Sequence, residues 1–196
     1  MIFWLCGSSW NLLATSATVA GAPLRATGLL ATLAGVPIKA ATIEVQQLTV
    51  SAAGVPSEQT LARTLTAGDG TWSVPLAPPS NLLVRALCSS APATASPLSL
   101  VAVAPAITLA PVPYAPPADA REQLLAGSIT PHKPLVTVTV QRAGHPEPLA
   151  TKSVRVVGGR FQLALKLGAG VWWLRAQSAA DASNLAGASP RLVLRI

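Results

Sequence analysis

Apolar and polar residues alternate in many short runs along this chain, and glycine and proline separate the runs. Valine alternates with threonine over residues 135–141, and every second position of a later run is apolar at Phe161, Leu163, Leu165 and Leu167. Successive side chains of a β-strand point to opposite faces, so this pattern predicts half-buried strands with one face in water. The turn residues between the runs favour an antiparallel arrangement with short connections.

The chain also contains an internal repeat. Three segments return in the same order in its second half: Gly70–Leu76 as Gly159–Leu165, Leu83–Ala86 as Trp173–Ala176, and Ser96–Pro97 as Ser189–Pro190. The distance between the copies is too long for a solenoid element and long enough for a domain. We therefore expect the same all-β unit to be built twice.

A proline-rich stretch lies between the two copies. Its prolines are Pro105, Pro111, Pro113, Pro116 and Pro117. Such a density of proline favours an extended, semi-rigid spacer over a flexible tether. The expected organisation is an apolar leader or docking arm (1–24), a first sandwich (25–104), a linker (105–118) and a second sandwich (119–196). Two domains held apart suit a stalk or a surface fibre better than a catalytic cleft.

The second copy resembles the bacterial immunoglobulin-like repeats of secreted and surface proteins. The segments that carry the resemblance are Leu125–Pro131, Val136–Arg142, Gly159–Phe161, Gly170–Ala176 and Ala188–Pro190. The first copy is similar more loosely, and its Gly-Thr-Trp stretch also resembles carboxypeptidase-regulatory or transthyretin-like modules. The resemblance implies two tandem immunoglobulin-like (Greek-key) β-sandwiches used for spacing, adhesion or assembly, and it implies no catalytic residue.

Composition agrees with short strands and turns. The chain is 51% hydrophobic and 11% charged, with Gly 14 and Pro 18, whereas soluble domains have about 25% charged residues. Cys6 lies in the leader and Cys88 in the first copy, so neither copy can form an internal disulfide or a site of closely spaced thiols.

Most of the net charge of +7 belongs to the second copy, where ten Lys and Arg oppose four Asp and Glu from Ala118 onward. A basic surface is compatible with an acidic glycan, an anionic membrane surface or nucleic acid as partner. The alternative is that the charges keep the surface soluble and protect strand edges. The basic residues are dispersed without a recognisable motif, so we expect no nucleic-acid binding.

Residues 1–24 carry no charge and begin with an apolar run. A basic segment typical of secretory signals is missing, and polar residues interrupt the run, so we expect no transmembrane span. Two interpretations remain: a degenerate export signal, or a strand or arm that packs on a partner. Trp4 and Trp10 would anchor such an arm as large amphipathic side chains.

Residues that could perform chemistry are scattered. Asp69 has a turn role beside Gly70, and His132 and His145 both lie near prolines in expected loops, without a third metal ligand. The chain contains no phosphate-binding glycine loop and no nucleophile elbow. We therefore expect no enzyme activity, no cofactor and no metal site.

Trp173 and Arg175 are the candidate binding residues. Alternation over residues 171–176 directs Trp172 and Leu174 inward, so Trp173 and Arg175 share the outer face. An exposed Trp beside an Arg can stack on a sugar or anchor a protein interface. The alternative is that Trp173 lies under a neighbouring loop or against the other domain.

Three functions are compatible with these observations. The first is a non-catalytic module of the cell envelope or extracellular space that acts as a spacer or binds a protein partner, including a second copy of itself. The second is a structural subunit of a virion or filament that docks through residues 1–24. The third is a carbohydrate-binding accessory domain for an acidic or neutral glycan.

Overall fold

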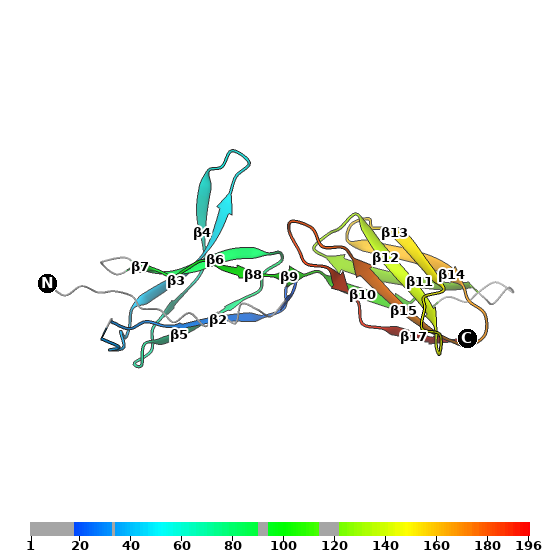
Figure 1. Ribbon diagram of the computed structural model, residues 1–196, viewed down its shortest axis with the longest axis horizontal. Coiled ribbons are helices and arrows are strands. Elements are labelled where there is room, and N and C mark those ends of the chain that lie inside the picture. Colours follow the sequence, from blue (N-terminus) through cyan, green and yellow to red (C-terminus); the bar gives the residue numbers. More distant parts are fainter. Residues whose placement is uncertain (1–17, 33, 90–93, 114–121) are drawn as a thin grey trace. The chain divides into compact units, whose positions relative to one another are not determined.

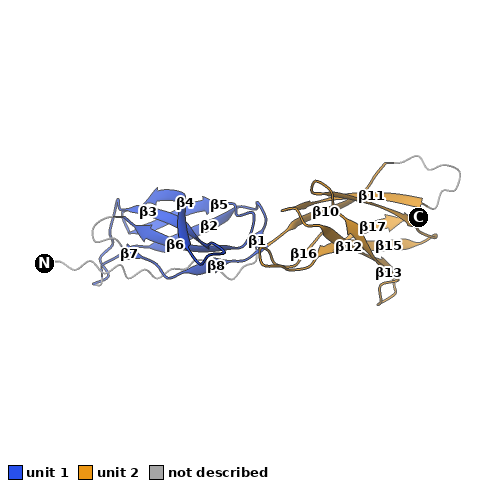
Figure 2. Ribbon diagram, turned by 90° about the horizontal axis from the view of Figure 1, so that it is seen from above, with its two compact units in different colours: residues 1–103 blue, residues 104–196 orange. Residues whose placement is uncertain are grey.

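The alternating runs form β-strands throughout the described chain, and the expected all-β class is confirmed (Figure 1). The structure is a computed structural model that describes residues 18–32, 34–89, 94–113 and 122–196. The chain divides into two compact units, Met1–Val103 and Ala104–Ile196, coloured blue and orange in Figure 2. Among the described residues there is no helix long and apolar enough to cross a membrane.

The second unit is a sandwich of two antiparallel sheets. One sheet has three strands in the order β10 (Ala106–Pro111), β11 (Glu122–Thr130) and β14 (Arg160–Lys166). The other has the order β13 (Ala150–Arg155), β12 (Leu135–Arg142) and β15 (Val171–Ser178), with β16 (Gly187–Ala188) and β17 (Leu192–Arg195) both paired to β15. Consecutive strands that change sheet in this order define an immunoglobulin-like Greek-key sandwich.

The core of the second unit lies where the inward residues of both sheets meet. Val136 and Val138 are fully buried on β12, and Phe161 is buried on β14. Leu125 and Leu174 are fully buried in an adjoining cluster. Burying a side chain of this size contributes about 1.5–3 kcal/mol relative to leaving it exposed.

The first unit has the same two layers. One sheet pairs β2 (Leu24–Leu29) with β5 (Thr71–Leu76). The other has the order β4 (Pro56–Leu65), β3 (Thr42–Val50), β6 (Leu82–Cys88) and β7 (Thr94–Ala95), with β8 (Ser99–Val101) also paired to β6. The short strands β1 (Thr18–Val19) and β9 (Val103–Ala104) form a separate pair. Ile43, Val45, Trp72 and Val74 lie in its core.

The repeated Ser-Pro pairs have the same structural role in both units. The Ala86 N–H donates to Ser96 Oγ, and the Ala176 N–H donates to Ser189 Oγ, each over 3.0 Å. Each serine hydroxyl then donates to the carbonyl oxygen of the following proline at 2.8 Å. In each unit the serine thus satisfies a buried N–H of a central strand, β6 or β15, which explains why the Ser-Pro pair recurs.

A glycine facing an aromatic ring is a second shared feature. Gly28 stands directly opposite Trp72, and Gly127 stands directly opposite Phe161. A Cβ at either glycine would collide with the facing ring, so the ring packs over bare backbone. The positive φ of Gly70 (78°) and Gly159 (75°) at the preceding turns needs glycine as well.

The structure differs from the expected linker of residues 105–118. Residues 106–111 form β10, which pairs with β11 from Ala106↔Thr130 to Pro111↔Leu125. Ile107 alternates into the core. Pro105 stands just before this edge strand and Pro111 is its last residue, two places where a missing N–H is tolerated. The first long strand of the second unit thus lies within the segment that the proline count had identified as a spacer.

The first residues of the chain are described only from Thr18. Ala20 is buried beside Leu82 and Val84, and Leu24 begins β2, so the end of the expected leader belongs to the first sandwich. Trp4 and Trp10 lie outside the described residues.

Candidate functional site

The outer face of the β12–β15 sheet presents polar and charged side chains in a fixed register. Thr139 pairs with Arg175, and Gln141 pairs with Trp173, so these four side chains are neighbours on one face. Arg191 joins them from the residues just before β17. Together with Gln177, they line a hollow of about 190 Å³.

Trp173 lies on the outer face, as the alternation predicts, while Trp172 and Leu174 are buried below it. Its side chain is half-buried, because the guanidinium of Arg191 lies over the ring with Cζ 4.5 Å from the centroid. Such a cation–π contact contributes about 0.5–1 kcal/mol at an exposed site. Trp173 is therefore not an open platform, and its contact with Arg191 holds a positive charge in place.

Arg175 is oriented by the backbone next to it. Its Nε donates to the carbonyl oxygen of Ser189 over 3.2 Å, and Ser189 is itself fixed by its hydroxyl bonds. None of the ion pairs formed by the described residues involves Arg175 or Arg191. The hollow is also lined without a carboxylate, so it concentrates positive charge.

Sequence reasoning missed Arg191. The signal was present, because Arg191 directly follows the repeated Ser189–Pro190 pair. Its contact with Trp173 depends on the register of β17 on β15, in which Val193 pairs with Trp173 and Leu192 with Leu174. Alternation within one strand contains no information about how two strands are aligned.

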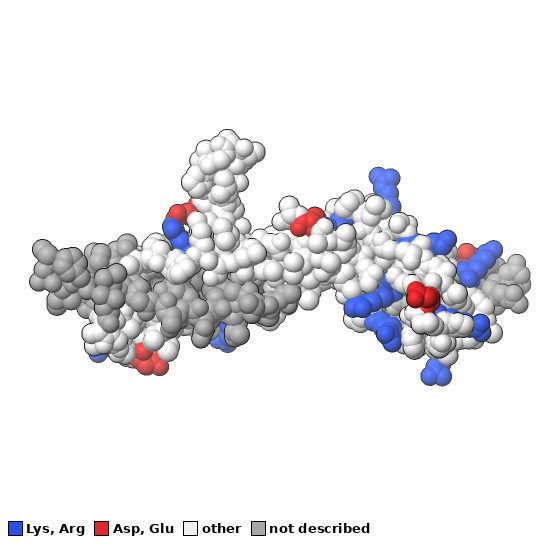
Figure 3. All heavy atoms as spheres, viewed as in Figure 1, with Lys and Arg blue, Asp and Glu red and all other residues white. Residues whose placement is uncertain are grey.

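The equivalent face of the first unit carries its own carboxylates. Arg85, which corresponds to Arg175, forms an ion pair with Glu58 over 2.6 Å and donates from Nε to Gln46 Oε1 over 3.3 Å. Glu44 pairs with Arg63 over 3.0 Å on the same sheet. Figure 3 shows Lys and Arg more widely spread than Asp and Glu over the second unit.

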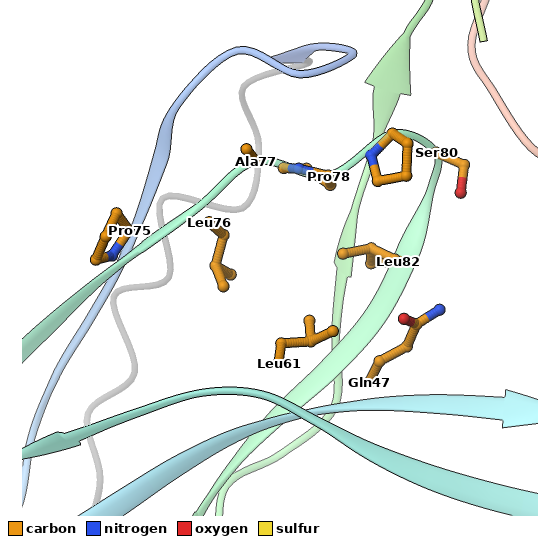
Figure 4. A pocket seen from close by; sticks show the side chains of 9 residues that line it. Gln47, Leu61, Pro75, Leu76, Ala77, Pro78, Ser80 and Leu82 are labelled. Atoms are coloured by element: carbon orange, nitrogen blue, oxygen red, sulfur yellow. The ribbon is translucent and has the colours of Figure 1, made fainter.

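Two hollows of the first unit are lined without charged residues. The smaller one, of about 320 Å³, is shown in Figure 4, where Leu61, Leu76 and Leu82 come from three different strands around the opening. Gln47 and Ser80 are its polar side chains. These residue types offer neither an acid, a base nor a nucleophile tuned for catalysis.

The carboxylates with shifted acidity have structural partners. Hydrogen bonds from the hydroxyl and the N–H of Thr71 hold the pKa of Asp69 below its usual value in the turn before β5. A hydrogen bond from Lys133, followed by bonds from the Ser183 and Asn184 N–H groups, holds the pKa of Asp181 below its usual value. Both groups are acceptors that stabilise loops.

His132 and Cys88 lie in structural surroundings. His132 Nδ1 accepts the N–H of Gly159 over 3.2 Å, and the thiol of Cys88 is buried. Within the described residues, no three His, Cys, Asp or Glu side chains form a group that could hold a metal ion. The expectations of no cofactor, no metal and no catalysis remain predictions.

No protein-family model and no curated protein matches the sequence. Among solved structures, the chain is similar to the human OSCAR ligand-binding domain at 11% identity, covering 95% of this chain and 96% of that one with a TM-score of 0.34. It is also similar to the fibronectin(III)-like modules of Clostridium thermocellum CbhA at 12% identity (96% and 94% covered, TM-score 0.30). A tetra-tandem repeat from the extending region of a large adhesion protein matches at 17% identity (95% and 48% covered, TM-score 0.36).

These likenesses are too distant to carry an argument about function. The class of the protein rests on its own strand order, which is that of immunoglobulin-like β-sandwiches.

Proposed function

We propose that this chain is a non-catalytic adhesive module of the cell envelope or extracellular space that binds a protein partner through the second unit. The binding surface is the outer face of the β12–β15 sheet around Trp173, Arg175 and Arg191, called the Trp173 face below. The observation that carries the proposal is the hollow in which two arginines lie beside a half-buried tryptophan without a carboxylate.

The composition of the Trp173 face supports a protein interface. Tryptophan and arginine are the residues most enriched among those that dominate binding energy at interfaces. Both arginines are held before any partner arrives, Arg191 by the ring and Arg175 by the Ser189 carbonyl. A side chain that is already oriented loses less conformational entropy on binding, which favours affinity.

The other two functions have less support. A neutral sugar would need an open aromatic face, and Arg191 covers one face of Trp173. Docking of a virion or filament subunit through residues 1–24 depends mainly on residues outside the described ones, so it stays a prediction. The resemblance of the second copy to repeats of secreted and surface proteins supports a location outside the cell or in its envelope.

Attachment of coated beads tests the proposal. Microspheres that carry the chain are allowed to settle on surfaces coated with extracellular protein or with polysaccharide, and the retained beads are counted after washing. We expect retention on protein coats that is lost with Trp173→Ala. Leu83→Ala changes the corresponding position of the first unit and is the matched control, with retention unchanged.

Retention that is equal for Trp173→Ala and the unchanged chain would contradict the proposal, as would a complete lack of retention on every coat. Circular dichroism and thermal melting of each variant establish that the sandwiches remain folded.

A further inference from the structure

The two arginines of the Trp173 face define the chemistry of the partner. We infer that the hollow between Arg175 and Arg191 binds a side-chain carboxylate, supplied by an extended acidic segment of a protein partner. The inference rests on the proposed function, because it names the group that the proposed surface recognises. A guanidinium presents a planar set of donors that matches the two oxygens of a carboxylate.

The donors around the hollow suit an anion. Arg175 uses Nε for the Ser189 carbonyl, and the Arg191 guanidinium lies over the Trp173 ring. Neither arginine forms an ion pair with a carboxylate of the described residues. Gln141 donates from Nε2 to the carbonyls of His145 and Pro146 over 2.6 and 3.1 Å, which fixes the hairpin at the edge of the face. Two like charges held close together are stabilised when an opposite charge joins them.

The first unit contains a template for this interaction. The strand registers match, since Gln46 pairs with Arg85 as Thr139 pairs with Arg175. In the first unit, Arg85 forms an ion pair with the carboxylate of Glu58 over 2.6 Å. The same fold therefore places a glutamate on the equivalent arginine, from a neighbouring extended strand.

The second unit lacks the strand position that would supply this glutamate. Glu58 belongs to β4 and stands opposite Leu48 of β3. Gln141 is the equivalent of Leu48 in the second unit, because Leu48 pairs with Leu83 as Gln141 pairs with Trp173. The pairing of β12 with β13 ends at Val140 and Ala150, so no residue of β13 stands opposite Gln141. The carboxylate that the first unit supplies internally has no equivalent along β13, which favours one from outside.

A peptide fits the surroundings better than a polysaccharide. Arg191 covers the ring that would stack on a sugar, and the internal template is a glutamate on an extended strand. Val193, which is 48% exposed, pairs with Trp173 and offers an apolar contact for the side chains of a peptide.

Fluorescence anisotropy with short labelled peptides tests the inference on the full chain. One peptide alternates glutamate with threonine, and its matched control has glutamine in place of every glutamate. We expect the glutamate peptide to bind at least about tenfold more tightly than the control, and more weakly as salt is raised, because the contact is between charges. Arg175→Gln and Arg191→Gln should each weaken binding by about tenfold or more, because a hydrogen bond to a charged group contributes at least that much.

Arg160→Gln is the matched control, because it removes the same charge from an exposed position on β14, in the other sheet. We expect it to change the affinity less than about twofold, as an unpaired rim charge does. Arg191→Lys keeps the charge but loses the planar fork, so its affinity should lie between those of the unchanged chain and Arg191→Gln.

Three results would overturn the inference. The first is equal or absent binding of the glutamate and glutamine peptides. The second is a loss with Arg160→Gln as large as that with Arg175→Gln, which would mean that net charge alone attracts the peptide. The third is tighter, Arg175-dependent binding of polygalacturonate or heparin fragments, which would assign the face to a polysaccharide. If beads still attach through Trp173 while the glutamate peptide does not bind, the inference fails and the proposed function stands.

Discussion

The outer faces of the two equivalent sheets differ, although the cores beneath them match. In the first unit, Leu83 and Leu98 occupy the positions of Trp173 and Arg191, and they are 37% and 50% exposed. Arg85 is neutralised there by Glu58, whereas no ion pair of the described chain involves Arg175. A repeated fold thus retains its buried pattern while its surface changes from an internally paired charge to a charge open to a partner.

Removing one large core side chain from each unit should have the largest effect. Leu174 and Val84 are both fully buried at equivalent positions. We expect Leu174→Ala to lower the free energy of unfolding of the second unit by about 2–5 kcal/mol, and Val84→Ala to cost the first unit less, because fewer carbon atoms are removed. Urea denaturation gives the size of each effect, and hydrogen exchange shows which unit opens. Equal loosening of both units by either substitution would show that they unfold as one body.

Adding a methyl group under the aromatic ring should have the next largest effect. Gly127→Ala places a Cβ against Phe161 and the Thr108 carbonyl, which forces the ring or the strand to move. We expect a loss of about 1–3 kcal/mol, as in other overpacked cores. Gly28→Ala is the matched change under Trp72, and thermal melting compares the two. The control is a glycine without neighbours. Exposed Gly168 has open space around an added Cβ and does not have the positive φ that makes Gly144 (85°) unsuitable. Gly168→Ala should therefore leave the melting temperature nearly unchanged.

Removing the ion-pair partner of Arg85 should allow the first unit to bind the glutamate peptide weakly. Glu58→Gln removes the carboxylate from Arg85, at a cost in stability of about 0–1 kcal/mol because the pair is partly exposed. In an Arg175→Gln background, we expect this change to restore weak binding of the glutamate peptide, now at the first unit. Binding should remain weaker than at the Trp173 face, since Leu98 replaces Arg191. Anisotropy that shows no gain would indicate that Arg85 alone is insufficient.

The smallest expected effect concerns pH. Asp181 has a pKa below the ordinary value of 3.8, chiefly because Lys133 donates a hydrogen bond to its carboxylate. A depressed pKa in the folded state means that the charged carboxylate stabilises the second unit above the unfolded value. This stabilisation is lost as the pH falls below 3.8 toward the folded pKa. Asp181→Asn should therefore flatten the acid limb of the unfolding free energy, measured by urea denaturation between neutral and acidic pH. An unchanged acid limb would assign that pH dependence to other carboxylates.

The alternation in the sequence was sufficient to assign strand faces. The burial of Val136, Val138, Trp172 and Leu174, and the outward position of Trp173, follow from a period of two residues. The turn at Asp69 and Gly70 was also predictable, because a positive φ and a side-chain acceptor are local properties. The repeat of Ser-Pro pairs indicated two copies of one unit.

Local composition was misleading where proline was dense. Residues 106–111 form an edge strand because the long strand β11 offers a partner for them, and a count of prolines contains no information about that partner. The same limit applies to the contact of Arg191 with Trp173, which depends on how β17 is aligned with β15.

The order of polar and apolar residues thus determined the fold class, the inward face of each strand and the twofold repetition, because these depend on neighbours along the chain. Only the tertiary structure decided that Arg85 meets a carboxylate while Arg175 and Arg191 surround a hollow without one. Those contacts join residues far apart in sequence, and strand register sets their distances.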